Sequence, residues 1–278
     1  HTELETVYEE KNMSLTNDFR KSLEAMDGIL FADHPYGTQT VLGTQEHLKN
    51  PSVTNIKNYH KTYYVPNNMA ICLSGDFDPD EMLSIIEKYF GQMEPNTELP
   101  EVDFETKTVI ESPVSKEVYG LDAENIMIGW KYPGAGTQEA LVADVVSYIL
   151  SNGSAGLIDL NLNQQQKVLG AQAMSYTRPD AGEFLIMANP KQGQTLDEVK
   201  DLVLAEIAKL RAGDFDEALL TGTINNMKLR QMRMLESNSD RADMFVQSFI
   251  TGTDWADEVA WIDNLSKVTK QDVIDWAN

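Results

Sequence analysis

Two glutamates near the start of the chain, Glu3 and Glu10, are the side chains whose type and spacing best suit metal chemistry. They stand seven residues apart, which is two helical turns, so on a helix their carboxylates share one face. Carboxylates are zinc ligands, and this pair could form part of a metal site. Leu4, Val7 and Tyr8 form an apolar patch that would press the same helix against a core. An ordinary amphipathic helix with a solvated acidic face has the same pattern, so the segment alone leaves both interpretations open.

The histidines do not complete such a site within this sequence. The four are His1, His34, His47 and His60, and none has a second histidine four residues away, so the zinc motif H-x-x-E-H is absent. Their positions predict turn and surface roles, and none is assigned to a metal. The single cysteine, Cys72, lies in the apolar run MAICLSG and is predicted to be a small core residue. One cysteine excludes an internal disulfide and a cysteine-cluster zinc site.

The composition is that of a folded and strongly acidic protein. The chain has 278 residues, of which 42% are hydrophobic, and ten Tyr, nine Phe and four Trp. This content supports hydrophobic cores, and the length suits two domains. The net charge of −22 argues against a nucleic-acid partner and against an anionic membrane surface, because both require clustered Lys and Arg. No apolar run reaches the roughly 18 residues of a membrane span, and no signal peptide is visible.

Residue periodicity and cap residues predict that most of the chain is helical. Helices are predicted at 3–25 with Gly28 as the stop, at 52–63, 78–91, 137–153 and 195–213, and in pieces over 214–278. Short apolar runs between turn residues predict strands at 68–77, 106–112, 125–134, 171–176 and 182–190. The stretch 92–103 holds two prolines, several acids and no periodicity, so it is predicted to be a linker.

Four segments in a fixed order carry a resemblance to a known family. They are ELETVYEE at 3–10, HPYG at 34–37, YYVPNNM at 63–69, and the apolar run that ends in SGDF at 77. In this order and spacing the chain resembles the pitrilysin/insulinase family of zinc peptidases, which carry the inverted H-x-x-E-H motif. The resemblance covers residues 1–91 well and residues 104–278 more loosely.

The resemblance implies roles for the acids of the first helix. In this family the helix downstream of the H-x-x-E-H motif supplies a glutamate as the third zinc ligand. With Val7 setting the register, Glu10 matches that ligand. Glu3 matches an acid that does not bind the metal but supports the residues that do. Glu9 is then the adjacent non-ligand acid, and a slip of one residue would exchange Glu9 and Glu10.

The resemblance also implies that the chain is a fragment of a zinc metalloendopeptidase that begins after the H-x-x-E-H helix. The parent would hydrolyse peptides or small proteins through a zinc-activated water, whereas the fragment alone would be inactive and would bind no zinc tightly. Expected partners are the peptide substrate and the other half of the peptidase, on the same chain or on a separate subunit. The Arg and Tyr that the family's other half supplies align here with Asn163 and Gly170. The alternative is therefore a non-catalytic half that encloses substrate or scaffolds a partner.

The expected fold class is α+β, with two similar domains of the pitrilysin-like metallohydrolase type. Each would be a mostly antiparallel sheet with helices on one face, because the order strand, turn, capped helix at 68–90 recurs at 182–211. The expected boundaries are the C-terminal part of the first, metal-bearing domain at 1–91, a linker at 92–103, and a second, non-metal domain without its last strand at 104–278. Incomplete sheets would leave open edges, so association of two copies is also expected. The sequence predicts no compartment and no cleavage preference.

Overall fold

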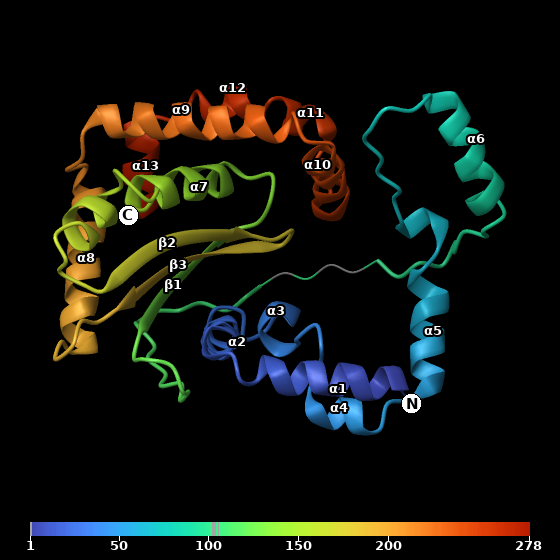
Figure 1. Cartoon of the computed structure of the whole chain (residues 1–278), viewed down its shortest axis with the longest axis horizontal. Coiled ribbons are helices and arrows are strands. Elements are labelled where there is room, and N and C mark those ends of the chain that lie inside the picture. Colours follow the sequence, from blue (N-terminus) through green and yellow to red (C-terminus); the bar gives the residue numbers. More distant parts are fainter. Residues whose placement is uncertain (1, 102–103, 105) are drawn as a thin grey trace.

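A single three-stranded antiparallel sheet organises the part of the chain that this computed structural model describes, which is residues 2–101, 104 and 106–278. Helices pack around this sheet, and an arm made of α5 and α6 lies apart from it (Figure 1). The N-terminal helices are α1 (Thr2–Ser14), α2 (Asp18–Leu30), α3 (Pro35–Thr38), α4 (Gln45–Lys49), α5 (Val53–Tyr63), the 3-10 turn η1 (Pro66–Asn68) and α6 (Pro79–Phe90). The remaining elements are β1 (Ile126–Pro133), α7 (Gln138–Leu150), the π-helical turn η2 (Asp159–Asn163), β2 (Gly170–Thr177), β3 (Ala181–Asn189), α8 (Leu196–Ala212), α9 (Glu217–Met234), α10 (Asn238–Thr251), α11 (Trp255–Val259), α12 (Trp261–Leu265) and α13 (Lys270–Ala277).

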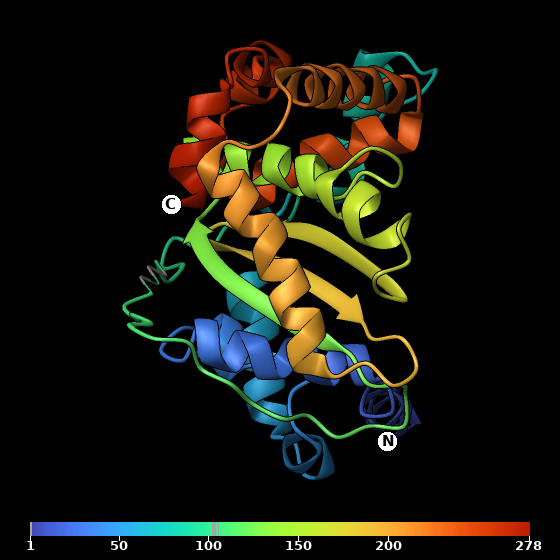
Figure 2. The ribbon, with the colours of Figure 1, turned by 90° about the vertical axis from the view of Figure 1, so that its left-hand side faces the viewer.

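The sheet has the order β1-β3-β2, so β3 is central and is buried along most of its length. Side chains alternate between the faces of a strand. Phe184, Ile186 and Ala188 join the main core with α7, α8 and α13, and α8 lies across this face in Figure 2. On the opposite face Leu185 is fully buried, and Met26 of α2 lies against the same region of the sheet.

Local sequence signals place the helices that cover the sheet. Thr195 and Glu198 form a capping box at the start of α8, and Gly213 ends that helix in the left-handed conformation with φ of 69°. Thr269 and Asp272 form a second capping box at α13. The predicted helices at 52–63, 78–91, 137–153 and 195–213 are therefore confirmed, as are the strands at 125–134, 171–176 and 182–190.

The prediction of one helix at 3–25 is wrong, because two helices occupy this range. The chain breaks after Ser14, and Asn17 caps a new helix by accepting a hydrogen bond from the Arg20 N–H at 2.9 Å. Gly28 lies inside α2 and does not end it. The capping preference of asparagine explains the break, because its side chain replaces a missing backbone partner at a helix start.

Two of the predicted strands are also wrong. The runs predicted as strands at 68–77 and 106–112 belong to no strand of the described sheet. A strand needs a partner that takes up its backbone hydrogen bonds, and no ladder partner for 69–74 lies among the described residues. Its side chains Ile71 and Leu73 stay about half exposed. The Lys107 and Thr108 N–H groups instead donate to the Asp33 carboxylate, at 2.6 and 3.2 Å.

The observed architecture therefore corrects part of the expected fold class. It is a mixed fold with a small antiparallel sheet, but every strand lies within 126–189, and residues 2–91 contribute none among those described. Helices also contact both faces of the sheet, because α2 packs on β1 from the side opposite α7 and α8. Among the described residues, no helix is both long and apolar enough to cross a membrane.

Candidate functional site

The helix α1 carries both predicted site residues, Glu3 and Glu10, and both side chains are exposed. The next residue, Lys11, is only 5% exposed and forms an ion pair with Glu24 of α2 at 3.5 Å. The Gln45 amide of α4 donates to Asn12 at 2.7 Å on the same helix. α1 is thus tied to its neighbours through residues beside Glu10, while Glu10 itself points to solvent.

The described residues do not form a zinc site by themselves. Zinc in proteins takes three or four protein ligands, and no group of three His, Cys, Asp or Glu side chains able to hold a metal occurs in the described ranges. Among the described residues no histidine lies at α1: His47 and His60 are exposed on α4 and α5, and His34 is buried as the cap of α3. The remaining histidine, His1, lies outside the described residues. The assignment of Glu10 as ligand and Glu3 as its support stays a prediction.

The segment HPYG forms a tight turn against the β2–β3 connection. The His34 Nδ1 accepts the Tyr36 N–H at 3.1 Å, and the Tyr36 hydroxyl donates to Asp180 at 2.9 Å. A Cβ at Gly37 would lie 2.3 Å from the Phe31 carbonyl oxygen, so the close approach of the two backbones requires glycine. The motif therefore joins the N-terminal helices to the end of the sheet.

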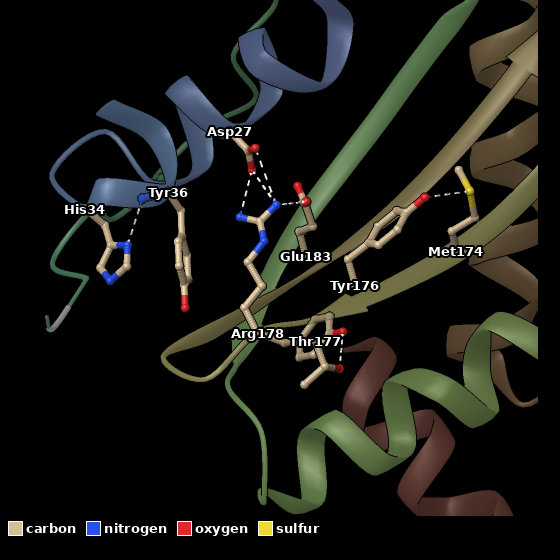
Figure 3. A network of polar contacts seen from close by, with 9 residues as sticks. Asp27, His34, Tyr36, Met174, Tyr176, Thr177, Arg178 and Glu183 are labelled. Atoms are coloured by element: carbon tan, nitrogen blue, oxygen red, sulfur yellow. Dashed lines mark hydrogen bonds and ion pairs between the residues drawn. The ribbon is translucent and has the colours of Figure 1, made fainter. Parts of the chain in front are cut away.

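A cluster of three charged side chains lies beside this turn and joins α2 to the sheet (Figure 3). Arg178, in the β2–β3 connection, donates to Asp27 of α2 at 3.0 and 3.1 Å and to Glu183 of β3 at 2.5 Å. Its guanidinium also lies over the rings of Tyr36 and Phe31, 4.8 and 5.5 Å from their centres. Cation–π contacts of this kind add to the attraction between opposite charges.

The electrostatics of this cluster are unbalanced, because one guanidinium faces two carboxyl groups. Glu183 is 1% exposed, and its Oε2 has no hydrogen-bond partner among the described residues. Burial, reinforced by the charge of Asp27, raises the pKa of Glu183 to about 7 against the opposing effect of Arg178. Burial also raises the pKa of Asp27. The pair therefore tends to hold one proton near neutral pH.

A cavity of about 590 Å³ lies between α7, β2 and α9. Asp144 on α7 accepts a hydrogen bond from the Ser175 hydroxyl at 2.6 Å, and burial raises the pKa of Asp144. Arg230 of α9 donates to the Tyr148 hydroxyl on the same lining. The cavity thus combines one carboxyl group, one guanidinium, and aromatic and thioether side chains.

The sequence analysis did not single out either of these polar groups. A signal was present at Glu183, which is the one charged residue in the apolar strand GEFLIMANP, and at Asp144 within ALVADVVSYIL. Charged residues are almost never fully buried unless they are paired. An isolated acid in an apolar strand predicts a basic partner, and for Glu183 that partner could have been predicted as Arg178. The contact with Asp27 has no comparable signal, since that residue lies on a separate helix.

Comparison with known proteins finds relatives that are named as zinc proteases. Zinc protease PqqE of Helicobacter pylori is 25% identical over 228 residues, which are 78% of this chain and 50% of that protein. The uncharacterized zinc protease YmxG of Bacillus subtilis is 23% identical over 249 residues, which are 86% and 57% of the two chains. The chain therefore spans about half the length of these relatives.

The fold and a family profile agree with these relatives. A crystal structure of a protease from Helicobacter pylori superposes with a TM-score of 0.88 at 21% identity, covering 100% of this chain and 68% of that one. At this identity the likeness shows the fold alone. Residues 52–227, more than half of the chain, match the family description "Peptidase M16 inactive domain". The resemblance to the zinc peptidases predicted from the sequence is thereby confirmed, and the chain belongs to the peptidase M16 family.

Proposed function

We propose that this chain is part of a zinc metalloendopeptidase and supplies Glu10 as one zinc ligand, with Glu3 as the acid that supports the site. The observation that carries the proposal is the setting of α1. Glu3 and Glu10 face solvent, while Lys11 anchors the same helix to α2. The names of the relatives, both zinc proteases, support zinc chemistry in the parent protein. The described residues offer fewer than the required ligands, so the remaining ones would come from an H-x-x-E-H helix outside this sequence.

In this proposal residues 1–91 belong to the metal-bearing domain, residues 92–103 link it to the second domain, and residues 104–278 form that second domain and enclose the substrate. Two features of the second part support the enclosing role. The strand β2 lies at an edge of the described sheet, and an extended peptide can add to such an edge through its backbone. The cavity of about 590 Å³ borders the same strand and can accept side chains of the peptide. Backbone pairing of this kind gives affinity with modest sequence selectivity.

A second candidate is a non-catalytic half that encloses substrate or scaffolds a partner without any role in zinc binding. The match of residues 52–227 to an inactive domain favours this candidate. That match does not include α1, where Glu3 and Glu10 lie. The two candidates therefore make different predictions for α1.

The deciding experiment compares this chain with a longer protein that includes the sequence preceding residue 1. Zinc content is measured by inductively coupled plasma mass spectrometry, and hydrolysis is measured on a library of quenched fluorescent peptides. We expect about one zinc per polypeptide and peptide cleavage from the longer protein, and neither from the 278-residue chain, because a carboxylate alone cannot hold zinc. A longer protein that binds no zinc would support the non-catalytic candidate. Stoichiometric zinc on the 278-residue chain would mean that the ligand set is wrong.

A further inference from the structure

Two ion-pair contacts on α2 connect the helix that carries Glu10 to the sheet. Lys11 of α1 pairs with Glu24 of α2 at 3.5 Å. One turn further along α2, Asp27 accepts hydrogen bonds from Arg178, which also holds Glu183 of β3. Residues three apart on a helix lie on neighbouring positions of one side, so α2 bridges α1 and the sheet through charged side chains.

Polar contacts hold α2 at its other end as well. Asp18, the first residue of α2, accepts the N–H groups of Leu121 and Asp122 at 2.5 and 2.8 Å. The apolar contact of this region is small. Leu30, Phe31 and Ala181 are buried together, Met26 and Tyr36 pack against them, and Leu185 is buried on the same face of the sheet. The main core beneath α7 and α8 is far larger. Charged and hydrogen-bonded groups therefore add to this small apolar contact in fixing α2 in place.

We propose that the cluster of Asp27, Arg178 and Glu183 is a positioning element, which fixes α2 on the sheet and so sets the orientation of α1 and Glu10. The part of this proposal that concerns Glu10 rests on the proposed function. The part that concerns α2 does not. None of the three residues is assigned contact with zinc or substrate.

A proton on Asp27 or Glu183 matters because of the groups that surround these two acids. With both acids ionised, the buried cluster would carry one uncompensated negative charge, which is strongly unfavourable in a medium of low dielectric constant. No second cation reaches the pair among the described side chains, since the nearest candidate, Lys131 opposite Glu183 in the sheet, directs its ammonium group to Thr106 and Thr108. The other titratable groups around the cluster are Glu24 on α2, Tyr132 on β1, Tyr176 on β2, His34 and Tyr36 at the α3 turn, and Asp180 in the β2–β3 connection.

The direction of the pH dependence follows from Glu183. Its pKa in the folded protein, about 7, lies above the ordinary value of 4.5. The stabilising effect of the protonated acid is therefore fully present below the ordinary pKa and is lost as the pH rises through about 7. The attachment of α2 to the sheet should weaken over this interval and then change little at higher pH.

The test is hydrogen–deuterium exchange of the 278-residue chain, read on peptides from α1 and α2 and corrected for intrinsic exchange at each pH. In the wild type, protection of α2 should fall as the pH rises from about 5 to about 8. The expected decrease is on the order of 100-fold, because the difference between the folded and the ordinary pKa of Glu183 sets its size. Glu183→Gln mimics the protonated acid and should make this protection independent of pH. The matched control is Glu206→Gln, because Glu206 is also buried, at 2% exposed, but pairs with Lys209 on α8.

Two outcomes would overturn the proposal. One is an α2 protection that does not depend on pH in the wild type, or that keeps its dependence in Glu183→Gln. The other is an α1 protection that does not follow α2, which would remove the link to Glu10. Lys11→Met should uncouple α1 from α2 without changing the response of α2. These measurements need no zinc, so they remain decisive even where the longer protein fails to bind the metal. If it does bind, the pH profile of its zinc affinity should flatten in Glu183→Gln.

Discussion

Replacing Glu10 by glutamine in the longer, zinc-binding protein is expected to remove the metal and the peptidase activity together. An amide is a poor zinc ligand because it carries no negative charge, and a three-ligand site that loses its carboxylate loses both affinity and geometry. Glu3→Gln should have the smaller effect of a supporting residue, a loss of metal affinity of about 10- to 100-fold. Zinc content and kcat/KM for a cleaved peptide are the two readouts. An effect on folding alone would not produce a larger loss of both at Glu10 than at Glu3.

The same helix provides matched controls for this experiment. Glu5 and Glu9 are also exposed on α1, so Glu5→Gln and Glu9→Gln change the charge equally. Both variants should keep zinc and activity near the wild-type level. If Glu9→Gln loses the metal and Glu10→Gln keeps it, the register set by Val7 is wrong by one residue. Retention of zinc in all four variants would exclude α1 from the site.

Arg178→Met is expected to have the largest effect on stability of any single change at the joint between α2 and the sheet. The substitution leaves Asp27 and Glu183 facing each other without a cation, and breaking a buried charge pair typically lowers the free energy of unfolding by about 3–5 kcal/mol. The loss should be smaller at low pH, where both acids can be protonated. Urea denaturation at pH values on both sides of the Glu183 pKa of about 7 measures this difference.

Arg233→Met is the matched control for this variant. Arg233 lies exposed on α9, and exposed substitutions of this kind usually change stability by less than about 0.5 kcal/mol. An Arg178→Met protein as stable as this control would show that the cluster contributes nothing to the joint. A second variant, Arg178→Met with Glu183→Leu, should recover part of the loss, because apolar replacement of a buried pair removes the unpaired charge.

Much of the helical part of this fold could be predicted from the sequence because its signals are local. The capping box of Thr195 and Glu198 and the left-handed Gly213 lie within the helix that they delimit, so both ends of α8 were predicted closely. The break between α1 and α2 is also local, at Asn17, but a continuous acidic and apolar pattern runs across it. Periodicity alone does not distinguish one long helix from two that are joined by a cap.

The strands were harder to predict because pairing depends on distant residues. The apolar run at 69–74 has the composition of a strand but lacks a ladder partner among the described residues. Within 106–112, the N–H groups of Lys107 and Thr108 donate to Asp33 instead. β-propensity expresses suitability for a pleated surface and does not supply the neighbouring strand. For the same reason only part of the cluster at Arg178 could be predicted from the sequence. Glu183 stood out as an acid in an apolar strand, but its second neighbour, Asp27, lies far away in the chain.

The separation of Asp27 and Arg178 by 151 residues has a kinetic consequence. Closing a loop of this length loses more chain entropy than the sequential pairing of α7, β2, β3 and α8, so α2 is expected to dock after the sheet and its helices have formed. A contact made after the folding transition state changes the unfolding rate and leaves the refolding rate nearly unaltered. Stopped-flow experiments on Arg178→Met should therefore show faster unfolding with unchanged refolding, and slower refolding would place the contact in the folding nucleus. On this view the cluster governs how long α2 and α1 stay attached, rather than how quickly they attach.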